Sequence, residues 1–372
     1  MAFGVMLLAA CGLAGPARHG RLARSSISAS AVGPVPGRSM LGVRIAGVGA
    51  AAPEARRTNV DLESIVDTSD EWIAKRTGIK SRHLLGPDGS ISALAISAAI
   101  GALESAGVAA SEVDMVVLAT SSPDDLFGDA AMVASGIGAT NAVGFDLTAA
   151  CSGFLFAVVT ASQFVHTGAY KNVLVIGADA LSRWVDWDDR NTCILFGDGA
   201  GAVLIRQEDS SAGHGPGLLG YEMRSDGTGR SELGLSYKGE ERQLSETAGA
   251  VSKGSYGSIS MNGKEVYKFA CSKVPEVLNT ALANAGLTAD DVDHLLLHQA
   301  NIRIIESVAS KLGIPMSKVI SNLSEYGNTS AASIPLALNE AVKAGTVKPG
   351  DVIACAGFGA GLSWGAAIIR WG

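Results

Sequence analysis

Cysteine, proline and charged side chains are scarce in this chain of 372 residues. Its five cysteines include no CxxC pair and no Cys/His cluster at the spacing of zinc ligands. We therefore expect neither a disulfide framework nor a metal site, and we predict a reducing compartment. Eleven prolines against 46 glycines exclude a Pro-rich linker architecture and favour many tight turns.

Positive charge and long apolar runs are also lacking. The formal net charge is −7, and no basic run is interleaved with aromatics, which argues against nucleic-acid binding. No apolar run reaches the roughly 20 residues that a membrane span needs. Hydrophobic residues make up 47% of the chain and charged residues 17%, which is enough apolar material for a large core. We predict a soluble globular protein.

The N-terminal segment 1–40 has a composition of its own. Four arginines and a serine-rich patch lie between positions 18 and 38, and the first acidic residue is Glu54. This composition is typical of an organellar transit peptide, and the apolar start at 2–15 resembles a short signal-peptide core. We predict that 1–40 is a targeting leader, of one or two parts, and that the mature protein lies in the plastid stroma. The alternative is a disordered tail on a cytosolic protein.

From Leu41 onward, apolar strand patterns alternate with Ala-rich helical patterns, which indicates an α/β protein with buried strands. The predicted strands are 113–122, 142–150, 172–179, 294–300 and 351–359. The predicted helices are 93–106, 153–166, 266–285 and 302–312.

The sequence also repeats itself. The segment ALESAGVAASEVDMVVLATSS, from Ala102, resembles ALANAGLTADDVDHLLLHQAN, from Ala281, at an ungapped offset of 179 (281 minus 102). NVLVIGA aligns with DVIACAG at that same offset, and Cys151 aligns with Ser330. We infer two tandem halves of like fold, 41–211 and 212–372, with the functional site between them.

Three residues at the ends of these elements could carry chemistry. Cys151 lies between a predicted strand and a predicted helix, where the helix dipole and free N–H groups favour a thiolate nucleophile. His298 ends a strand, and Asn328 precedes the helix that mirrors the Cys151 helix. Taken singly, they could be a buried structural cysteine, a core histidine and an N-cap. Together, on duplicated elements, they predict one catalytic centre.

The other cysteines lack such a position. Cys193 and Cys355 lie in apolar, strand-like runs, Cys271 lies inside a helix, and Cys11 lies in the leader.

Two glycine clusters, 196–202 and 357–365, could be mistaken for nucleotide-binding loops. Neither opens a βαβ unit, and no P-loop lysine follows either cluster. We therefore expect no nucleotide cofactor. The second cluster ends a strand, so its backbone N–H groups could line an oxyanion hole.

Six motifs occur in an order typical of one family: TSDEWIAKRTGI, DLTAACSGF, FGDGAGA, HQANIRI, YGNTSAASIP and GFGAGLSWG. From about Leu41 to Gly372 the chain closely resembles β-ketoacyl-acyl-carrier-protein synthase III, and SRWVDWDDR and PDDLFGDAA resemble the plant and cyanobacterial branch. The resemblance implies the thiolase fold, with two similar halves in an αβαβα arrangement. It also implies a homodimeric acyltransferase that needs no cofactor and joins acetyl-CoA to malonyl-acyl carrier protein.

Residue roles follow from the same resemblance. Cys151 matches the acylated nucleophile, and His298 and Asn328 match the pair that promotes malonyl decarboxylation. The backbone N–H groups of Cys151 and Ala360 match the oxyanion donors, although the family has a glycine at the second position. The residues that match coenzyme A contacts are Thr68, Trp72, Arg76, Arg190, Asn301 and Arg303. Those that match the carrier-protein patch are Lys268, Arg303 and Lys311, and those that match the acyl-pocket wall are Phe127, from across the dimer, and Leu195.

Three other functions are alternatives to this one. A type III polyketide synthase shares a Cys, His and Asn set but uses malonyl-CoA. A papain-like thiol hydrolase uses the same three side chains, but its CG-[SA]-C-[WY] signature is absent and tandem α/β halves do not fit it. A non-catalytic binding subunit would have lost the nucleophile, which this chain retains.

Overall fold

The computed structural model describes residues 40–207 and 215–372, all of which lie in the unit that begins at Pro34. The predicted leader, 1–40, therefore lies outside the described residues except for Met40. The boundary predicted between the two halves, at 211 and 212, also lies outside them and stays a prediction.

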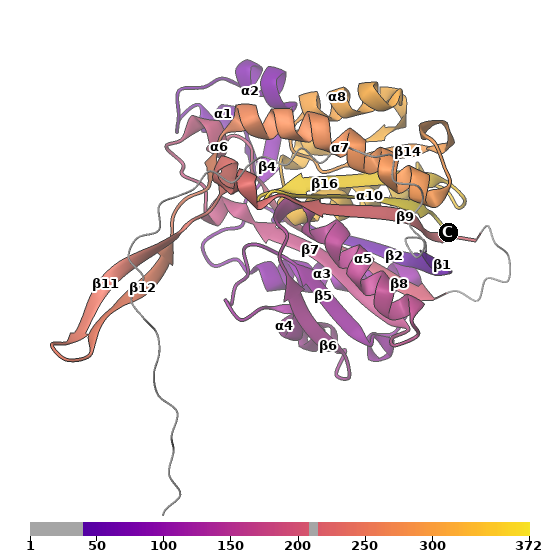
Figure 1. The fold of residues 1–372 in the computed structure, drawn as a ribbon, viewed down its shortest axis with the longest axis horizontal. Helices are drawn as coiled ribbons and strands as arrows, with labels where there is room; N and C mark the ends of the chain where they lie inside the picture. Colours follow the sequence, from indigo (N-terminus) through magenta and orange to yellow (C-terminus); the bar gives the residue numbers. More distant parts are fainter. Residues whose placement is uncertain (1–39, 208–214) are drawn as a thin grey trace, which may run out of the picture. The chain divides into compact units, whose positions relative to one another are not determined.

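Two sheets of the same topology form the centre of the described chain (Figure 1). The first has the order β2 (Val43–Ala51), β8 (Asp198–Gln207), β7 (Asn172–Ala180), β5 (Met115–Ala119), β6 (Val143–Leu147). The second has the order β1 (Met40–Leu41), β9 (Gly217–Ser225), β17 (Ser363–Arg370), β16 (Val352–Gly359), β14 (His294–Leu297), β15 (Val319–Ile320).

Strand directions confirm the similarity of the two halves. In the first sheet β7, β5 and β6 are parallel, and β8 runs antiparallel to both β7 and β2. In the second, β16, β14 and β15 are parallel, and β17 runs antiparallel to both β16 and β9. The repeat found in the sequence therefore corresponds to a repeated sheet.

Helices cover both faces of each sheet. The longer ones are α3 (Ile91–Ala106), α4 (Ala130–Ile137), α5 (Gly153–His166), α7 (Gly263–Ala285), α8 (Ile302–Leu312) and α10 (Ser333–Lys343). The short elements are β3 (Arg56–Thr58), α1 (Asn59–Leu62), α2 (Asp70–Thr77), β4 (Ser81–His83), α6 (Arg190–Cys193), β10 (Leu233–Gly234), β13 (Ser260–Met261) and α9 (Leu323–Tyr326).

Alternation along the strands divides the core into layers. Val173 and Val175 of β7 pack in one cluster with α5, α10 and the second sheet, whereas Leu174 and Ile176 pack with α3 and α4. Residues of α7 and α8 pack on the outer face of the second sheet. The layers are thus α3/α4, sheet, α5/α10, sheet, α7/α8, which confirms the αβαβα thiolase arrangement. Strands buried on both faces explain the continuous apolar runs in the sequence.

The predicted helices and strands are present, but the strands predicted at 113–122, 142–150 and 294–300 extend past the observed ends. Helices predicted at 153–166 and 302–312 have those bounds, and the others begin two or three residues earlier, at Ile91 and Gly263. Cys193, however, ends a short helix rather than lying in a strand, so that prediction was wrong. Asp189 caps this helix by accepting from Asn191 N–H, and a short apolar run alone cannot distinguish a buried helix from a strand.

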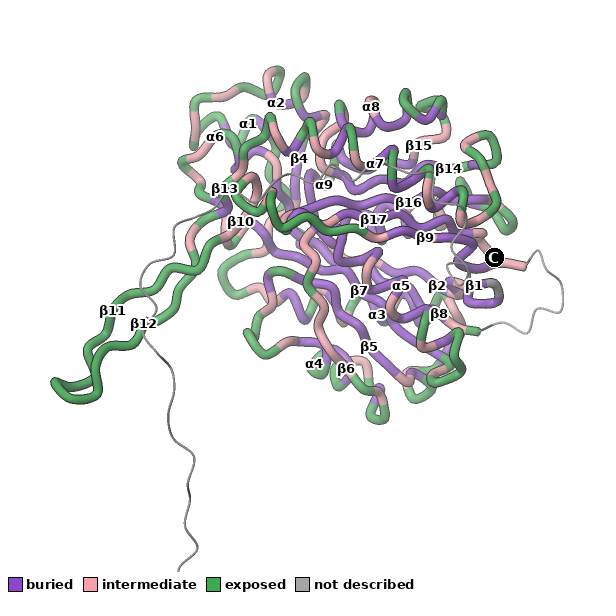
Figure 2. Tube along the Cα trace, in the orientation of Figure 1, coloured by how far each residue is buried: buried purple, intermediate pink, exposed green. Residues whose placement is uncertain are grey.

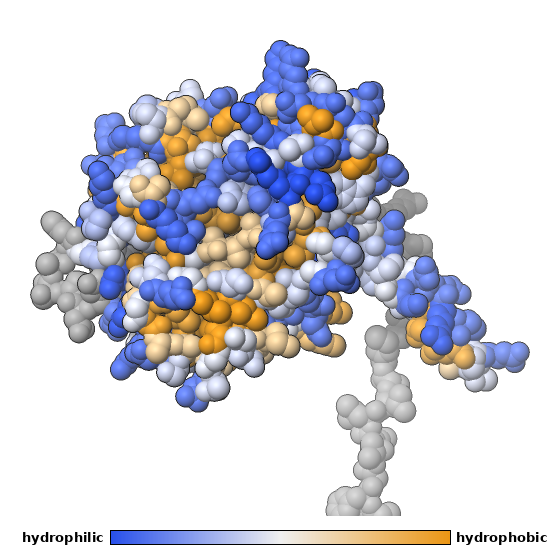
Figure 3. Space-filling model, turned by 180° about the vertical axis from the view of Figure 1, so that it is seen from behind, coloured by the Kyte–Doolittle hydropathy of each residue, from blue (hydrophilic) through white to orange (hydrophobic). Residues whose placement is uncertain are grey.

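A long hairpin projects from the body, formed by β11 (Tyr237–Ser245) and β12 (Gly249–Tyr256) (Figures 1 and 2). Every residue of both strands is exposed, and Figure 3 shows polar and apolar side chains along it. At its base, a Cβ atom on Gly254 would lie 2.4 Å from the Tyr237 ring, so glycine lets the ring lie against the opposite strand. No predicted helix or strand covers this hairpin.

Among the described residues, no helix combines the length and apolar character that crossing a bilayer requires.

Candidate active site

Cys151 lies where the sequence predicted, between a strand and a helix. It occupies a single 3₁₀ turn, Ala150–Ser152, after β6 and directly before α5. Strand β16 approaches this turn so closely that a Cβ atom on Gly359 would lie 2.6 Å from the Cys151 backbone nitrogen. The second glycine cluster therefore allows close packing against the Cys151 backbone. Ala360 also lines the cleft and has no positive φ, so a side chain is tolerated there.

His298 and Asn328 line the same cleft as Cys151. His298 follows β14, is buried, and has its Nδ1 atom 3.1 Å from the Ser333 hydroxyl oxygen. The Asn328 backbone N–H donates to Leu195 O at 2.8 Å, and its Oδ1 atom accepts from Ser330 N–H at 2.9 Å. The Asn328 side-chain NH₂ group is therefore the donor that this residue can offer to a ligand. The structure thus places all three residues at one cleft.

Burial sets the charge state of both titratable groups. It lowers the pKa of His298 to about 3, so the imidazole is neutral at neutral pH. When Ser333 donates to Nδ1, the His298 hydrogen lies on Nε2, which can then donate to a ligand. Burial also raises the pKa of Cys151 to about 12, against the hydrogen bond from Ser330. At this site desolvation therefore opposes the effect of the helix start on the Cys151 thiol.

The cleft has a volume of about 2100 Å³, which is large enough for an extended ligand. Four of the predicted coenzyme A contacts line it, namely Trp72, Arg76, Asn301 and Arg303. Arg76 and Arg190 stack on the Trp72 ring, at 4.7 and 4.9 Å from its centroid. Thr68 does not line the cleft, and its buried hydroxyl has no hydrogen-bond partner among the described residues.

The start of α8 is fixed against the end of α2. Asn301 caps α8 by accepting from Arg303 N–H at 2.9 Å, and its amide donates to Arg76 O at 3.2 Å. The Arg303 guanidinium donates to Lys75 O at 3.1 Å. These hydrogen bonds bring together three of the predicted coenzyme A contacts, namely Arg76, Asn301 and Arg303, from distant parts of the sequence.

The predicted carrier-protein lysines lie on the neighbouring α7 and α8, outside the residues that line the cleft. Lys268 forms an ion pair with Glu265 at 2.7 Å. Lys311 donates to Cys271 O at 2.8 Å, which joins α8 to α7. Lys311 therefore has a structural contact as well as a positive charge.

The two predicted acyl-pocket residues differ in burial. Leu195 is half-buried and lines the cleft, whereas Phe127, at the cleft's rim, is 99% exposed. Within one chain, Phe127 thus lines the cleft with a side chain that is almost wholly exposed.

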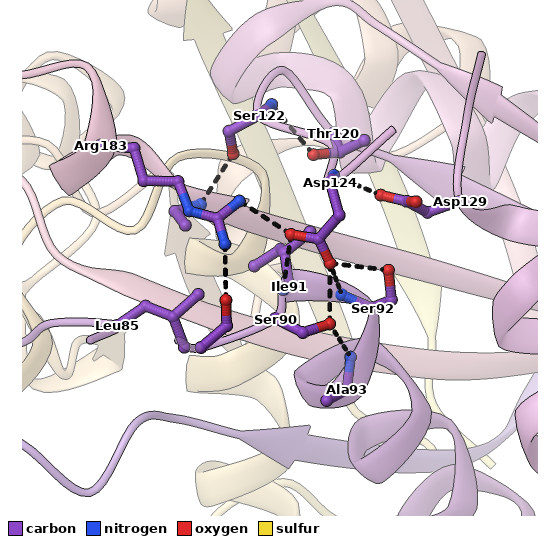
Figure 4. A network of polar contacts seen from close by, with 12 residues as sticks. Leu85, Ser90, Ile91, Ser92, Ala93, Thr120, Ser122, Asp124, Asp129 and Arg183 are labelled. Carbon is purple, nitrogen blue, oxygen red and sulfur yellow. Dashed lines mark hydrogen bonds and ion pairs between the residues drawn. The ribbon is translucent and has the colours of Figure 1, made fainter. Parts of the chain in front are cut away.

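The loop that carries Phe127 is firmly anchored (Figure 4). Asp124 accepts from Ser90, Ser92 and Arg183, which ties the loop to the start of α3. Burial raises the pKa of Asp124, but the hydrogen bonds from Ser92, Arg183 and Ser90 outweigh it and hold the pKa below its usual value. The exposed ring of Phe127 is thus presented on a fixed loop.

The chain is similar to known proteins of one family over most of its length. A model described as 3-oxoacyl-[acyl-carrier-protein (ACP)] synthase III matches residues 145–227, and one described as its C terminal matches 282–371. A beta-ketoacyl-[acyl-carrier-protein] synthase III from Trichormus variabilis is 56% identical over 332 residues, covering 89% of this chain and 99% of the relative. The chain belongs to the 3-oxoacyl-[acyl-carrier-protein] synthase III family.

Other members of this family are similar to the chain over the same share of its length. The protein of that name from Microcystis aeruginosa is 58% identical over 330 residues, which is 89% of this chain and 98% of the relative. A crystal structure of the synthase III from Aquifex aeolicus has a TM-score of 0.80 at 42% identity, covering 89% of this chain and all of that chain. The chain is therefore an acyltransferase of the thiolase fold.

Several residues at this synthase III site were not predicted from the sequence. Ser330 contacts Cys151, Ser333 contacts His298, and the buried Asp179 accepts from the N–H group of Ala331, next to Ser330. Lys264, Tyr267 and Arg230 line the outer cleft. Only Ser330 had a signal in the sequence, as the repeat partner of Cys151. Among the described residues, no group of three or more His, Cys, Asp or Glu side chains could hold a metal.

Proposed function

We propose that this chain starts fatty-acid synthesis by a decarboxylating condensation of acetyl-CoA with malonyl-acyl carrier protein. The products are acetoacetyl-acyl carrier protein, coenzyme A and carbon dioxide. The observation that carries the proposal is one cleft lined by Cys151, His298 and Asn328, with Trp72 and arginines also lining it, in a member of the synthase III family.

In the first half-reaction, the Cys151 sulfur attacks the acetyl-CoA thioester. The tetrahedral oxyanion accepts hydrogen bonds from the backbone N–H groups of Cys151 and Ala360, and coenzyme A leaves an acyl-enzyme. Trp72 offers a flat face and Arg76, Arg190 and Arg303 offer positive charge for the coenzyme A nucleotide.

In the second half-reaction, malonyl-acyl carrier protein takes the place of coenzyme A. Loss of carbon dioxide places negative charge on the malonyl thioester oxygen, and the neutral His298 and the Asn328 amide donate to it. The carbanion then attacks the acyl-cysteine. The departing carboxylate leaves the electron pair of the new carbon–carbon bond, so the scheme requires neither a redox cofactor nor a metal.

Product analysis after one turnover tests the substrate assignment. With malonyl-acyl carrier protein and acetyl-CoA, we expect acetoacetyl-acyl carrier protein, and little condensation when malonyl-CoA replaces the carrier-bound substrate. Equal use of malonyl-CoA would instead support the polyketide alternative. The family membership does not favour that alternative. One solved relative is nevertheless described as the priming β-ketosynthase of the R1128 polyketide pathway. It is 35% identical, has a TM-score of 0.79, and the match covers 91% of this chain and 98% of that chain.

Charge reversal tests the carrier-protein patch. Lys268→Glu with Lys311→Glu should raise the KM for the carrier protein much more than the KM for acetyl-CoA, because carrier proteins are acidic. Wild-type activity should also fall as salt screens the attraction. Lys273→Glu is the matched control, since this exposed α7 lysine also pairs with a glutamate. Equal KM changes for both substrates would count against the patch.

Phe127 should limit primer length from across a homodimer. Because it is 99% exposed and its loop is fixed, its ring can enter the acyl pocket of a second copy of the chain. Wild type should then strongly prefer acetyl-CoA to octanoyl-CoA, since displacing a packed aromatic costs about 1 to 3 kcal/mol.

Phe127→Ala should widen acceptance toward octanoyl-CoA, which competition assays on both proteins would measure. Leu126→Ala is the control, because this neighbouring loop residue is also exposed. An unchanged chain-length preference in Phe127→Ala would remove Phe127 from the pocket.

Residues 1–40 should direct the protein to plastids. Their arginine and serine content supports a transit peptide, and the relatives from Trichormus variabilis and Microcystis aeruginosa are cyanobacterial, as expected for a plastid-type enzyme. A fluorescent protein fused to 1–40 should accumulate in plastids, whereas a diffuse cytosolic signal would contradict the assignment.

A further inference from the structure

Arg82 is a buried cation that the condensation scheme above does not use. It lies on β4, is 0% exposed, and does not line the cleft. Burial lowers the pKa of Arg82 to about 10, so the guanidinium keeps its positive charge at neutral pH. Taking a charge out of water is costly unless hydrogen bonds compensate it, so the contacts of this group indicate what its burial achieves.

The guanidinium joins two distant segments through hydrogen bonds to neutral oxygens. Its Nη2 atom donates to Ile194 O at 2.8 Å, and its Nη1 atom donates to Asn59 Oδ1 at 3.0 Å and to Arg57 O at 3.5 Å. None of these acceptors is a carboxylate, and Nε has no partner among the described residues. Hydrogen bonds from a charged donor are strong, and the rigid fork of a guanidinium fixes the relative position of its acceptors.

The Ile194 carbonyl belongs to the segment that holds Asn328. In this segment, Leu195 O accepts from Asn328 N–H at 2.8 Å, and Gly197 N–H donates to Asn328 O at 3.0 Å. Asn328 therefore pairs with segment 194–197 in a short parallel bridge centred on Phe196. Because both backbone groups of Asn328 are held by this segment, the position of the segment determines where the Asn328 side chain lies in the cleft.

The aliphatic stem of Arg82 also packs against this pairing. A Cβ atom on Gly197 would lie 3.1 Å from the Arg82 Cβ atom, and one on Gly327 would lie 3.6 Å from it. Next to Arg82, the Ser81 hydroxyl donates to Glu325 O at 2.9 Å, which ties β4 to the neighbouring α9 (Figure 2). Helix α9 ends directly before Gly327. Arg82 thus contacts the chain on both sides of the bridge.

We propose that Arg82 is a positioning residue for the decarboxylation step. Through Ile194 O, its guanidinium holds segment 194–197 at the place where the pairing with Asn328 directs the Asn328 side-chain amide into the cleft. Arg82 touches no reacting atom and acts through Asn328, so this inference rests on the role proposed above for Asn328. Loss of the guanidinium should therefore impair the half-reaction that uses Asn328 and spare acetyl transfer.

Single-turnover assays of both half-reactions on Arg82→Gln test the proposal. Glutamine keeps a side-chain N–H donor, but it is shorter and uncharged and cannot bond to Ile194 O and Asn59 together. Release of carbon dioxide from malonyl-acyl carrier protein should fall by about 10- to 100-fold, since a small misplacement of a preorganised group has effects of this size. Acetyl transfer from acetyl-CoA should stay close to that of wild type.

A double-mutant cycle separates positioning of Asn328 from a general structural role. If Arg82 acts through Asn328, adding Arg82→Gln to Asn328→Ala should lower carbon dioxide release no further than Asn328→Ala alone, whereas independent effects would multiply. A multiplied loss in the double variant, or an equal loss of both half-reactions in Arg82→Gln, would overturn the proposal.

Arg56→Gln is the matched control. Arg56 is also an arginine next to β4 and α9, but it is half exposed, and its side chain bonds to Ser81 and Glu325 rather than to segment 194–197. Its loss should leave the ratio of the two half-reactions unchanged.

Should Arg82→Gln fail to fold, Arg82→Lys takes its place in the same cycle. Lysine keeps the positive charge, but its single ammonium group lacks the fork that holds Ile194 O and Asn59 at once. The same selective loss of carbon dioxide release is therefore expected in a folded Arg82→Lys protein. A wild-type ratio of the two half-reactions in that protein would overturn the proposal.

The Asn328→Ala arm distinguishes failure of this inference from failure of the proposed function. Carbon dioxide release at the wild-type rate in Asn328→Ala would refute the role proposed for Asn328, whatever the Arg82 variants do. Impaired release in Asn328→Ala, together with a wild-type ratio of half-reactions in the folded Arg82 variants, would refute the role of Arg82 alone.

Discussion

Cys151→Ala should abolish acyl-enzyme formation with acetyl-CoA. Of the four cysteines that the structure describes, only Cys151 lines the cleft, and the backbone N–H groups proposed for the oxyanion lie at this residue and at Ala360. No other sulfur in the described chain can take over the attack. The measurement is incorporation of labelled acetate into the protein, with residual labelling at background level.

Cys193→Ala and Cys355→Ala are the controls. Both residues are buried, in α6 and β16, and neither lines the cleft, so both variants should be acetylated like wild type once their folding is verified. Acetate label on Cys151→Ala, or its loss from Cys193→Ala in a folded protein, would contradict the assignment of the nucleophile.

His298→Ala and Asn328→Ala should separate the two half-reactions. Each side chain is proposed to donate to charge that develops only during decarboxylation, so acetyl transfer from acetyl-CoA should be largely preserved. Release of carbon dioxide from malonyl-acyl carrier protein should fall by about 10²- to 10³-fold in each variant, the usual effect of losing one preorganised donor. Single-turnover assays of both steps on the same preparation give the comparison.

His294→Ala is the matched control for the histidine variant. His294 lies at the start of the same strand and pairs with Asp351 at 3.0 Å, away from the residues that line the cleft. Its loss should leave the ratio of the two half-reactions unchanged. Unaltered carbon dioxide release in both His298→Ala and Asn328→Ala would refute the proposed roles.

Much of the fold could be predicted from local patterns in the sequence. Helices α5 and α8 have their predicted bounds, because each follows a strand after a short connection and closes where the apolar pattern stops. The repeat was readable because both halves place the same helix, turn and strand in the same order. The hairpin β11–β12 was missed, since its strands are exposed and carry no core-facing alternation.

The types and positions of the residues in the candidate site could be predicted from the sequence, but their pKa values and contacts could not. The position of Cys151 before a helix predicted a thiolate, yet how strongly burial raises its pKa depends on β16 and Ser330, which belong to the other half of the chain. The stacking of Arg76 and Arg190 on Trp72 likewise joins two distant segments. Asp179 looked like part of a strand, because what makes it distinctive is the set of donors folded around it.

Intact-mass measurement of the mature protein tests the central claim most directly. Incubation with acetyl-CoA alone should add the mass of one acetyl group, located on Cys151 by peptide analysis. Subsequent addition of malonyl-acyl carrier protein should return the protein to its unmodified mass as acetoacetyl-acyl carrier protein appears. A protein that takes up no acetyl group, or an acetyl adduct that persists unchanged in the presence of malonyl-acyl carrier protein, would contradict the account.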